Sequence, residues 1–214
     1  MKTHRYVLIS ILVVMLYTGT LEAARPFPTS DADVVGTMVY ELEVGSYFWS
    51  EDIFILTEFK HGITERMEIG VAFEYTIEPD VQGPFSAAEV GMKYTLVPSL
   101  FAVSMCGEFG STAYKLKGIF TRVINPVKCN LNFGYKASGV SDMPGIFFYS
   151  VGLIMKFQKF QIGGDISGDE DGLVGWLAGG NYKIIGEFAV DAGFSGTFNG
   201  NADYTAIVGL SYVF

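Results

Sequence analysis

Histidine is the residue best suited to acid–base catalysis, and this 214-residue chain has two, His4 and His61. Membrane-barrel hydrolases of the lipase type use Ser with His, and those of the protease type use Asp with His, near the outer leaflet or the loops. His61 precedes a short turn, Gly62 to Arg66, that we expect on the opposite, periplasmic side. We therefore predict no catalytic residues and no enzyme activity.

A second candidate for chemistry is an acidic stretch whose oxygen-bearing residues are spaced like calcium ligands: Asp165, Ser167, Asp169 and Asp171. A calcium loop needs glycine at its sixth position and a bidentate glutamate at its twelfth. Glu170 and Trp176 occupy those places. We predict a solvated acidic loop with no metal site and no cofactor. The alternative is a loose divalent site that bridges to lipopolysaccharide phosphates.

Composition excludes a nucleic-acid surface and favours a protein built from strands. Phosphate binding needs clustered Lys and Arg, whereas this chain has 14 basic residues, 23 acidic ones and a net charge of -9. Charged residues make up only 17% of the chain, and mean hydropathy is +0.33. Beyond the amino-terminal region, however, no apolar run reaches the roughly 20 residues that a membrane helix needs.

The amino-terminal region has the pattern of a secretory signal peptide. Lys2 and Arg5 precede an apolar run at 6–17, and small residues follow around Ala23. The apolar run is short for a bilayer span, which favours export over anchoring. We therefore assign 1–23 as a signal peptide, with an uncleaved anchor as the alternative.

Residues 24–36 are expected to lead into the folded part of the chain. Pro26 and Pro28 stand among Thr, Ser and Asp residues, a composition that disfavours helix and strand. We expect a periplasmic amino-terminal segment here, followed by a single outer-membrane barrel domain at 37–214. The sequence leaves open whether this segment threads into the interior of that domain as a plug.

The last residues of the chain show a clear strand pattern. From Tyr204 to Phe214, aromatic and aliphatic side chains alternate with a second set that includes Thr, Gly and Ser, which is the two-residue period of a strand. Closing this apolar strand against the first strand of a barrel would remove an exposed edge. The terminal Phe214 resembles the ending of bacterial outer-membrane barrels, which implies recognition by the barrel-assembly machinery.

The rest of the chain has the pattern of successive hairpins. We predict about twelve strands, at 37–49, 52–61, 67–76, 88–96, 100–110, 113–123, 127–136, 146–156, 160–166, 173–182, 185–194 and 204–214. Short turns, such as the one at 183–184, alternate with longer loops at 77–87, 137–145, 167–172 and 195–203.

This asymmetry is typical of an outer-membrane barrel with periplasmic turns. The predicted fold class is therefore an all-β, transmembrane, antiparallel up-and-down β-barrel in the bacterial outer membrane. Its expected surroundings are the lipid bilayer and lipopolysaccharide. The alternative is a soluble periplasmic barrel of the lipid-carrier type, whose charges would face outward to water.

The run at 67–76 separates an apolar face from a small or acidic one. Ile69 and Phe73 alternate with Glu68 and Glu74, and a charge in hydrocarbon is costly, so the second face must line the lumen. The same alternation predicts lumen-lining or solute-binding candidates at Glu41, Glu43, Glu58, Lys60, Glu68, Glu74, Glu89, Lys93, Glu108, Lys115, Lys117 and Lys128. It also places on this face Asn130, Asn132, Lys156, Asp165, Glu187 and Asp191. Because both signs occur, these residues either pair and fill the interior or contact a solute.

Three stretches carry a family resemblance: Arg25 to Asp31, Glu41 to Gly45 and, most strongly, His61 to Val71. They are similar to the outer-membrane family named after the meta-cleavage pathway of phenol degradation, whose members are regarded as transporters. Outside these stretches the chain agrees with the family in barrel character. The resemblance implies passive uptake of small, aromatic or amphipathic compounds, and it implies no catalytic residues.

The strand number limits the width of the expected lumen. A barrel of about twelve strands lies between those filled by side chains and the water-filled porins, so we expect a narrow path. We predict a passive channel or transporter for a small solute; the alternative is a non-conducting structural or surface-interaction barrel. Cys106 and Cys129 lie on strands that are not neighbours, so we expect no disulfide.

Overall fold

The structure is a computed structural model that describes residues 25–49, 52–77, 85–140, 144–198 and 204–214. The predicted signal peptide at 1–23 therefore lies outside the described residues. The strands are β1 (Tyr40–Trp49), β2 (Asp52–Thr64), β3 (Met67–Ile77), β4 (Glu89–Val97), β5 (Phe101–Glu108), β6 (Tyr114–Ile124), β7 (Val127–Ala137), β8 (Ile146–Lys156), β9 (Phe160–Asp169), β10 (Gly172–Ile185), β11 (Phe188–Thr197) and β12 (Tyr204–Val213). Within the described ranges, no helix is long and apolar enough to cross a bilayer.

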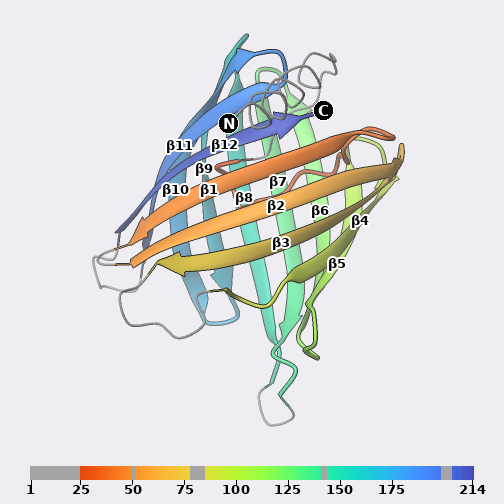
Figure 1. Cartoon of the computed structure of the whole chain (residues 1–214), viewed down its shortest axis with the longest axis vertical. Coiled ribbons are helices and arrows are strands. Elements are labelled where there is room, and N and C mark those ends of the chain that lie inside the picture. Colours follow the sequence, from red (N-terminus) through yellow and green to blue (C-terminus); the bar gives the residue numbers. More distant parts are fainter. Residues whose placement is uncertain (1–24, 50–51, 78–84, 141–143, 199–203) are drawn as a thin grey trace, which may run out of the picture.

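The strands close into one antiparallel barrel in which each strand pairs with its neighbours along the chain and β1 pairs with β12. In Figure 1 the front strands β1 to β3 cross the direction of the strands behind them, which reflects the tilt that closure requires. The prediction of an antiparallel barrel of about twelve strands is confirmed. The predicted strand boundaries also lie within a few residues of the observed ones, because the two-residue period is sustained along each run.

The two faces of the wall differ as the alternation predicts. On β3 the side chains of Ile69 and Val71 are 41% and 40% exposed on the outside, whereas Glu68 is 7% exposed on the inside. Apolar side chains outside and charged ones inside are the reverse of a soluble lipid-carrier barrel. That alternative is therefore excluded.

The barrel closes through the last residues of the chain. Leu42 on β1 lies opposite Tyr212 on β12. The backbone of Tyr40 and Phe214 exchanges two hydrogen bonds, of 2.8 and 2.9 Å, and their rings stack at 5.6 Å. His61 also stacks on the Tyr40 ring, with centroids 4.2 Å apart. The predicted pairing of the terminal strand with the first strand is confirmed.

Two predicted connections differ from the structure. The longer loop expected at 167–172 is a tight turn, because Gly172 adopts a φ of 127° and the Asp171 N–H donates to Asp169 Oδ1 at 2.9 Å. The turn expected at 183–184 comes later, at Gly186, whose φ is 54°. Both shifts arise because a glycine with positive φ decides where the chain reverses.

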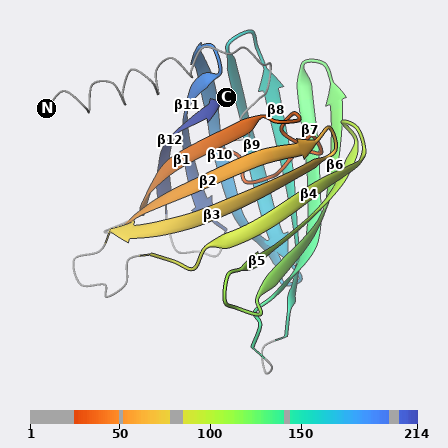
Figure 2. The same ribbon diagram turned by 45° about the vertical axis from the view of Figure 1, so that its right-hand side comes forward.

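The segment at 25–36, for which we expected a periplasmic lead-in and left a plug in the interior open, lies inside the barrel. Figures 1 and 2 show this red to orange segment inside the ring of strands. Phe27, Ala32 and Val35 are at most 6% exposed. An irregular segment can be buried here because polar lumen side chains bind its backbone groups. Its two prolines also lack a backbone N–H, so fewer donors need a partner.

Candidate functional site

Residues 25–36, which we name the belt, follow the inner wall around much of the barrel. Along the belt, polar groups bond in turn to residues of β11, β7, β6, β4 and β3: Asp191, Asn132, Thr121, Thr95 and Glu68. Gly36 ends the belt beside the start of β1, where its carbonyl accepts a hydrogen bond from Val39 at 3.0 Å. The belt therefore narrows the lumen from the wall inward.

Arg25, the first belt residue, is held by an ion pair, and a neighbouring glycine leaves room for its side chain. Arg25 Nε lies 3.3 Å from Asp191 Oδ2, and its guanidinium lies 5.5 Å from the centre of the Tyr47 ring. A Cβ at Gly45 would overlap the guanidinium. Burial lowers the pKa of Arg25, but Tyr47 and Asp191 more than offset it, so that the pKa is raised.

The middle of the belt is held by neutral hydrogen bonds. The Ser30 N–H donates to Asn132 Oδ1 and the Asn132 amide donates back to the Ser30 carbonyl, both at 2.8 Å. Ala32 is bound in the same reciprocal way, because its N–H donates to Thr121 Oγ1 at 2.9 Å and its carbonyl accepts from Thr95 Oγ1 at 2.6 Å. Paired donors and acceptors of this kind fix an irregular backbone as a strand ladder would.

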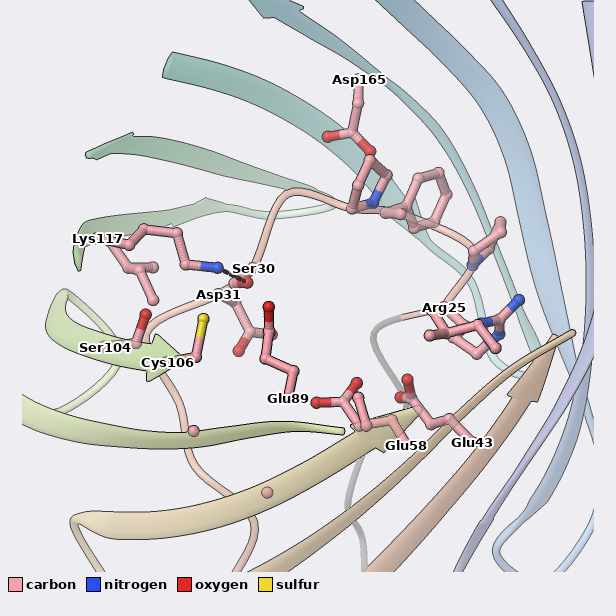
Figure 3. A pocket seen from close by; sticks show the side chains of 18 of the residues that line it. Arg25, Ser30, Asp31, Glu43, Glu58, Glu89, Ser104, Cys106, Lys117 and Asp165 are labelled. Atoms are coloured by element: carbon pink, nitrogen blue, oxygen red, sulfur yellow. Dashed lines mark hydrogen bonds between the residues drawn. The ribbon is translucent and has the colours of Figure 1, made fainter. Parts of the chain in front are cut away.

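A cavity of about 540 Å³, which we name the chamber, occupies the lumen beside the belt. Belt residues from Arg25 to Asp31 form one part of its boundary, and lumen-facing residues of the strands form the rest. Figure 3 shows Glu43 and Glu58 on one side of the chamber and Lys117 on another. Eight of the predicted lumen residues line it, namely Glu43, Glu58, Lys60, Glu68, Glu89, Lys93, Lys117 and Asp165.

On β1 and β2, carboxylates outnumber the ammonium group that they surround. Lys60 Nζ lies 3.4, 3.1 and 3.6 Å from carboxylate oxygens of Glu41, Glu43 and Glu58. Glu43 and Glu58 are direct cross-strand partners, an arrangement that is unfavourable for like charges unless a cation bridges them. The cluster is therefore stable only with Lys60 in place, and it retains an excess of negative charge.

Four other predicted residues form two ion pairs on the wall. Lys93 Nζ lies 3.1 Å from Glu68 Oε1, while Lys115 Nζ lies 4.0 Å from Glu89 Oε2. The interior charges thus pair with one another in part, which is one of the two alternatives given for the lumen residues; the other is contact with a solute.

Two predicted lysines bind the belt. Lys128 Nζ lies 2.9 Å from Asp31 Oδ2, and Lys117 Nζ donates to Ser30 Oγ at 2.6 Å. The sequence placed both lysines in the lumen but could not show that their partners come from the amino-terminal segment.

The remaining predicted residues lie outside the boundary of the chamber. Glu74 donates its backbone N–H to Ser86 Oγ at 3.0 Å, and Glu108 is exposed at the end of β5. Both face the lumen side by alternation, and Glu108 lies directly opposite Glu89 on β4.

Sequence reasoning missed the residues that seat the belt, above all the glycines. A Cβ at Gly179 would lie 2.8 Å from Pro26 Cγ, and one at Gly152 would lie 3.2 Å from Thr29 Cβ. The signal was present, because several glycines fall on the lumen face of the later strands. The sequence alone did not connect these glycines with a segment that needs room.

The other candidates for chemistry do not form a site in the described part of the chain. No group of three or more His, Cys, Asp and Glu residues there could hold a metal ion. Cys106 and Cys129 are free thiols, as predicted. The His61 Nδ1 lies 3.3 Å from the Val39 carbonyl, beside the barrel seam and away from the chamber.

The closed barrel with an apolar exterior and a charged interior defines the chain as a bacterial outer-membrane β-barrel. Solved structures share this fold. The KdgM porin has a TM-score of 0.63 at 12% identity, covering 81% of this chain and 99% of its own. An outer-membrane channel from Pseudomonas putida F1 has a TM-score of 0.57 at 7% identity, covering 88% of this chain and 100% of its own. Omp33 of Acinetobacter baumannii has a TM-score of 0.54 at 11% identity, covering 82% of this chain and 97% of its own.

At these identities the likeness shows the fold. No family model matches the chain. No curated protein matches its sequence either.

Proposed function

We propose that this protein is a passive outer-membrane channel for small solutes, narrowed by its own amino-terminal belt. The observation that carries the proposal is the chamber of about 540 Å³, which a fully packed barrel interior would not contain. Its lining combines charged and apolar side chains, which suits a small amphipathic solute. The porin and channel titles of the structural neighbours support the same role.

The resemblance to the phenol meta-cleavage family supports the finer proposal that the solute is aromatic or amphipathic. One solved neighbour is a KdgM porin in complex with disordered oligogalacturonate, a long polyanion. The carboxylate cluster around Lys60 would repel such a ligand. We therefore assign this chain a different and smaller solute.

We also propose that the protein is not an enzyme. The ring of His61 is stacked on Tyr40 beside the seam between the first and last strands. The substitution His61→Ala is expected to leave any hydrolase activity of the purified barrel at its background level. A His61-dependent turnover of an ester or peptide would contradict the proposal.

Planar-bilayer recording of the purified barrel tests the channel. We expect steady openings from the full chain, and larger ones from a variant that lacks residues 25–33 of the belt. Heat-modifiable migration on a gel checks that both forms are folded. Silence of both folded forms would remove the channel and leave the alternative, a structural or surface-interaction barrel.

A further inference from the structure

The charges that face the chamber form two main groups. Glu43 on β1 lies opposite Glu58 on β2, whereas the register of β4, β5 and β6 places Lys93, Ser104 and Lys117 in one row. Figure 3 shows the Glu43 and Glu58 carboxylates together, with the Lys117 ammonium across the chamber from them and the carboxylates of Asp31 and Glu89 between the two groups. We name the group at Glu43 and Glu58 the acidic pole and the group at Lys117 and Lys93 the basic pole.

The acidic pole can accept another cation. Lys60 lies within 3.6 Å of Glu41, Glu43 and Glu58, so one ammonium serves three carboxylates. The side chain of Glu58 is 36% exposed, whereas those of Glu41 and Glu43 are 4% and 5% exposed. Glu58 therefore presents the unsatisfied negative charge to the chamber.

The basic pole can accept an anion. Within the described part of the chain, the Lys117 ammonium donates to the neutral hydroxyl of Ser30 at 2.6 Å. Lys93, in the same row, is paired with Glu68 at 3.1 Å. An ammonium group has three donors, so Lys117 can bind a carboxylate while it keeps Ser30.

The lining of the chamber also includes small residues and an apolar patch. A Cβ at Gly70 would meet Glu58 Oε1 at 3.6 Å, which is an ordinary contact. Phe27 of the belt packs with Leu177 and Ile207, and all three line the chamber. The chamber therefore offers an apolar surface as well as the two poles.

We propose that the chamber selects small zwitterions with an apolar substituent, a specificity that rests on the proposed channel function. The ammonium group of the solute binds Glu58 with Glu43, its carboxylate binds Lys117, and its substituent lies on Phe27 and Leu177. A simple anion meets repulsion at the acidic pole, and a simple cation meets it at Lys117. A solute with both charges gains at both poles.

The test compares three ligands that share one phenyl ring. They are L-phenylalanine, 3-phenylpropanoate, which lacks the ammonium group, and 2-phenylethylamine, which lacks the carboxylate. Isothermal titration of each into the detergent-solubilised full chain at neutral pH measures binding without any need for conductance. We expect L-phenylalanine to bind at least tenfold more tightly than either analogue. Equal or tighter binding of an analogue would overturn the proposal.

Two variants locate the poles, each with a matched control at an exposed turn. Lys117→Met should weaken L-phenylalanine about tenfold and leave 2-phenylethylamine unweakened, whereas Glu58→Gln should weaken the amino acid and spare 3-phenylpropanoate. Lys159→Met and Glu65→Gln make the same charge changes far from the chamber and should alter neither affinity. Pole variants that bind the ligands as their controls do would overturn the assignment of the two poles. If a variant does not fold, the comparison of the three ligands on the unmodified chain still tests the specificity.

The two proposals fail separately. Conductance without preference for the zwitterion would end the specificity proposal and leave the channel. Binding of L-phenylalanine by a folded barrel that never conducts would support the specificity of the chamber and end the channel.

Discussion

The two halves of the barrel wall treat the interior differently. Strands β8 to β12 approach the belt closely, with glycines where it passes, as at Gly152 and Gly179. Strands β1 to β6 carry most of the lumen charges and border the open chamber, as Glu58 and Lys117 do. Missing side chains on one half thus make room for a fixed segment, while charged side chains on the other half keep a space hydrated.

The two halves of the wall are stabilised by different interactions, close packing on one and ion pairing on the other. Close packing against the belt depends on shape, so a single added carbon can disturb it. The charged half depends on the pairing of ions, so the loss of one cation leaves several carboxylates without compensation. Substitutions on the two halves should therefore fail in different ways.

The largest effect is expected from Lys60→Met on the charged half. The substitution leaves three mutually close carboxylates without their bridging cation and should destabilise the barrel by about 3–5 kcal/mol. The midpoint of heat-modifiable migration measures this loss. The loss should shrink in acid, because protonated carboxylates need no cation, and Lys159→Met serves as the control. Equal midpoints for the two variants would contradict the role of Lys60.

A smaller effect is expected from one added methyl group on the belt side. Gly209→Ala, on β12, should push the Arg25 guanidinium away from Asp191, because its Cβ would lie 2.8 Å from Arg25 Nε. In Gly70→Ala, on the chamber side, the added Cβ meets its nearest atoms at an ordinary 3.6 Å. Amide hydrogen exchange of belt residues should accelerate about tenfold in Gly209→Ala, which corresponds to about 1.4 kcal/mol. It should not change in Gly70→Ala. Equal acceleration in both would remove the distinction between the halves.

The sequence was sufficient for the wall because the two-residue period reports directly which side chains face lipid. It placed Glu68 inside and Ile69 outside, as found. The belt has no such period. Its position depends on contacts between residues far apart in the chain, such as Ser30 with Asn132, and these follow from three-dimensional packing alone.

The partners of the predicted lumen charges could not be read from the sequence either. The alternation identified Lys128 as a lumen residue, but its partner Asp31 lies in a segment that was expected outside the barrel. The charge separation between poles, by contrast, was visible in the sequence, since the early strands are rich in Glu and the later ones in Lys. Strand order in an up-and-down barrel follows chain order, so that separation carries over into space.

A moderate pH effect is expected at the point where the belt meets the basic pole. Burial raises the pKa of Asp31, but the ammonium groups of Lys128, Lys93 and Lys60 outweigh it and lower the pKa below its ordinary value of 3.8. The ionised carboxylate therefore stabilises the seated belt fully above that value, and the contribution is lost as the pH falls through the lowered pKa. Exchange protection of the belt amides, corrected for intrinsic rates, should fall from pH 5 to pH 3. Asp31→Asn should abolish this loss of protection in acid. If the belt of that variant loses as much protection, the pH dependence belongs to another titrating group.

The smallest effect is expected at Asp33, where the belt reaches the turn before β5. Asp33 Oδ1 accepts hydrogen bonds from the backbone N–H and the hydroxyl of Ser99, at 3.1 and 3.0 Å, but both partners are exposed to solvent. Water competes for each bond, so Asp33→Ala should cost less than about 1 kcal/mol. Exchange of the Ala32 amide, which is bound inside by Thr121, should therefore stay close to that of the unmodified chain. A loss of protection as large as that in Gly209→Ala would mean that the belt is held from its exposed end, and that the glycine-lined half of the wall only fits around it.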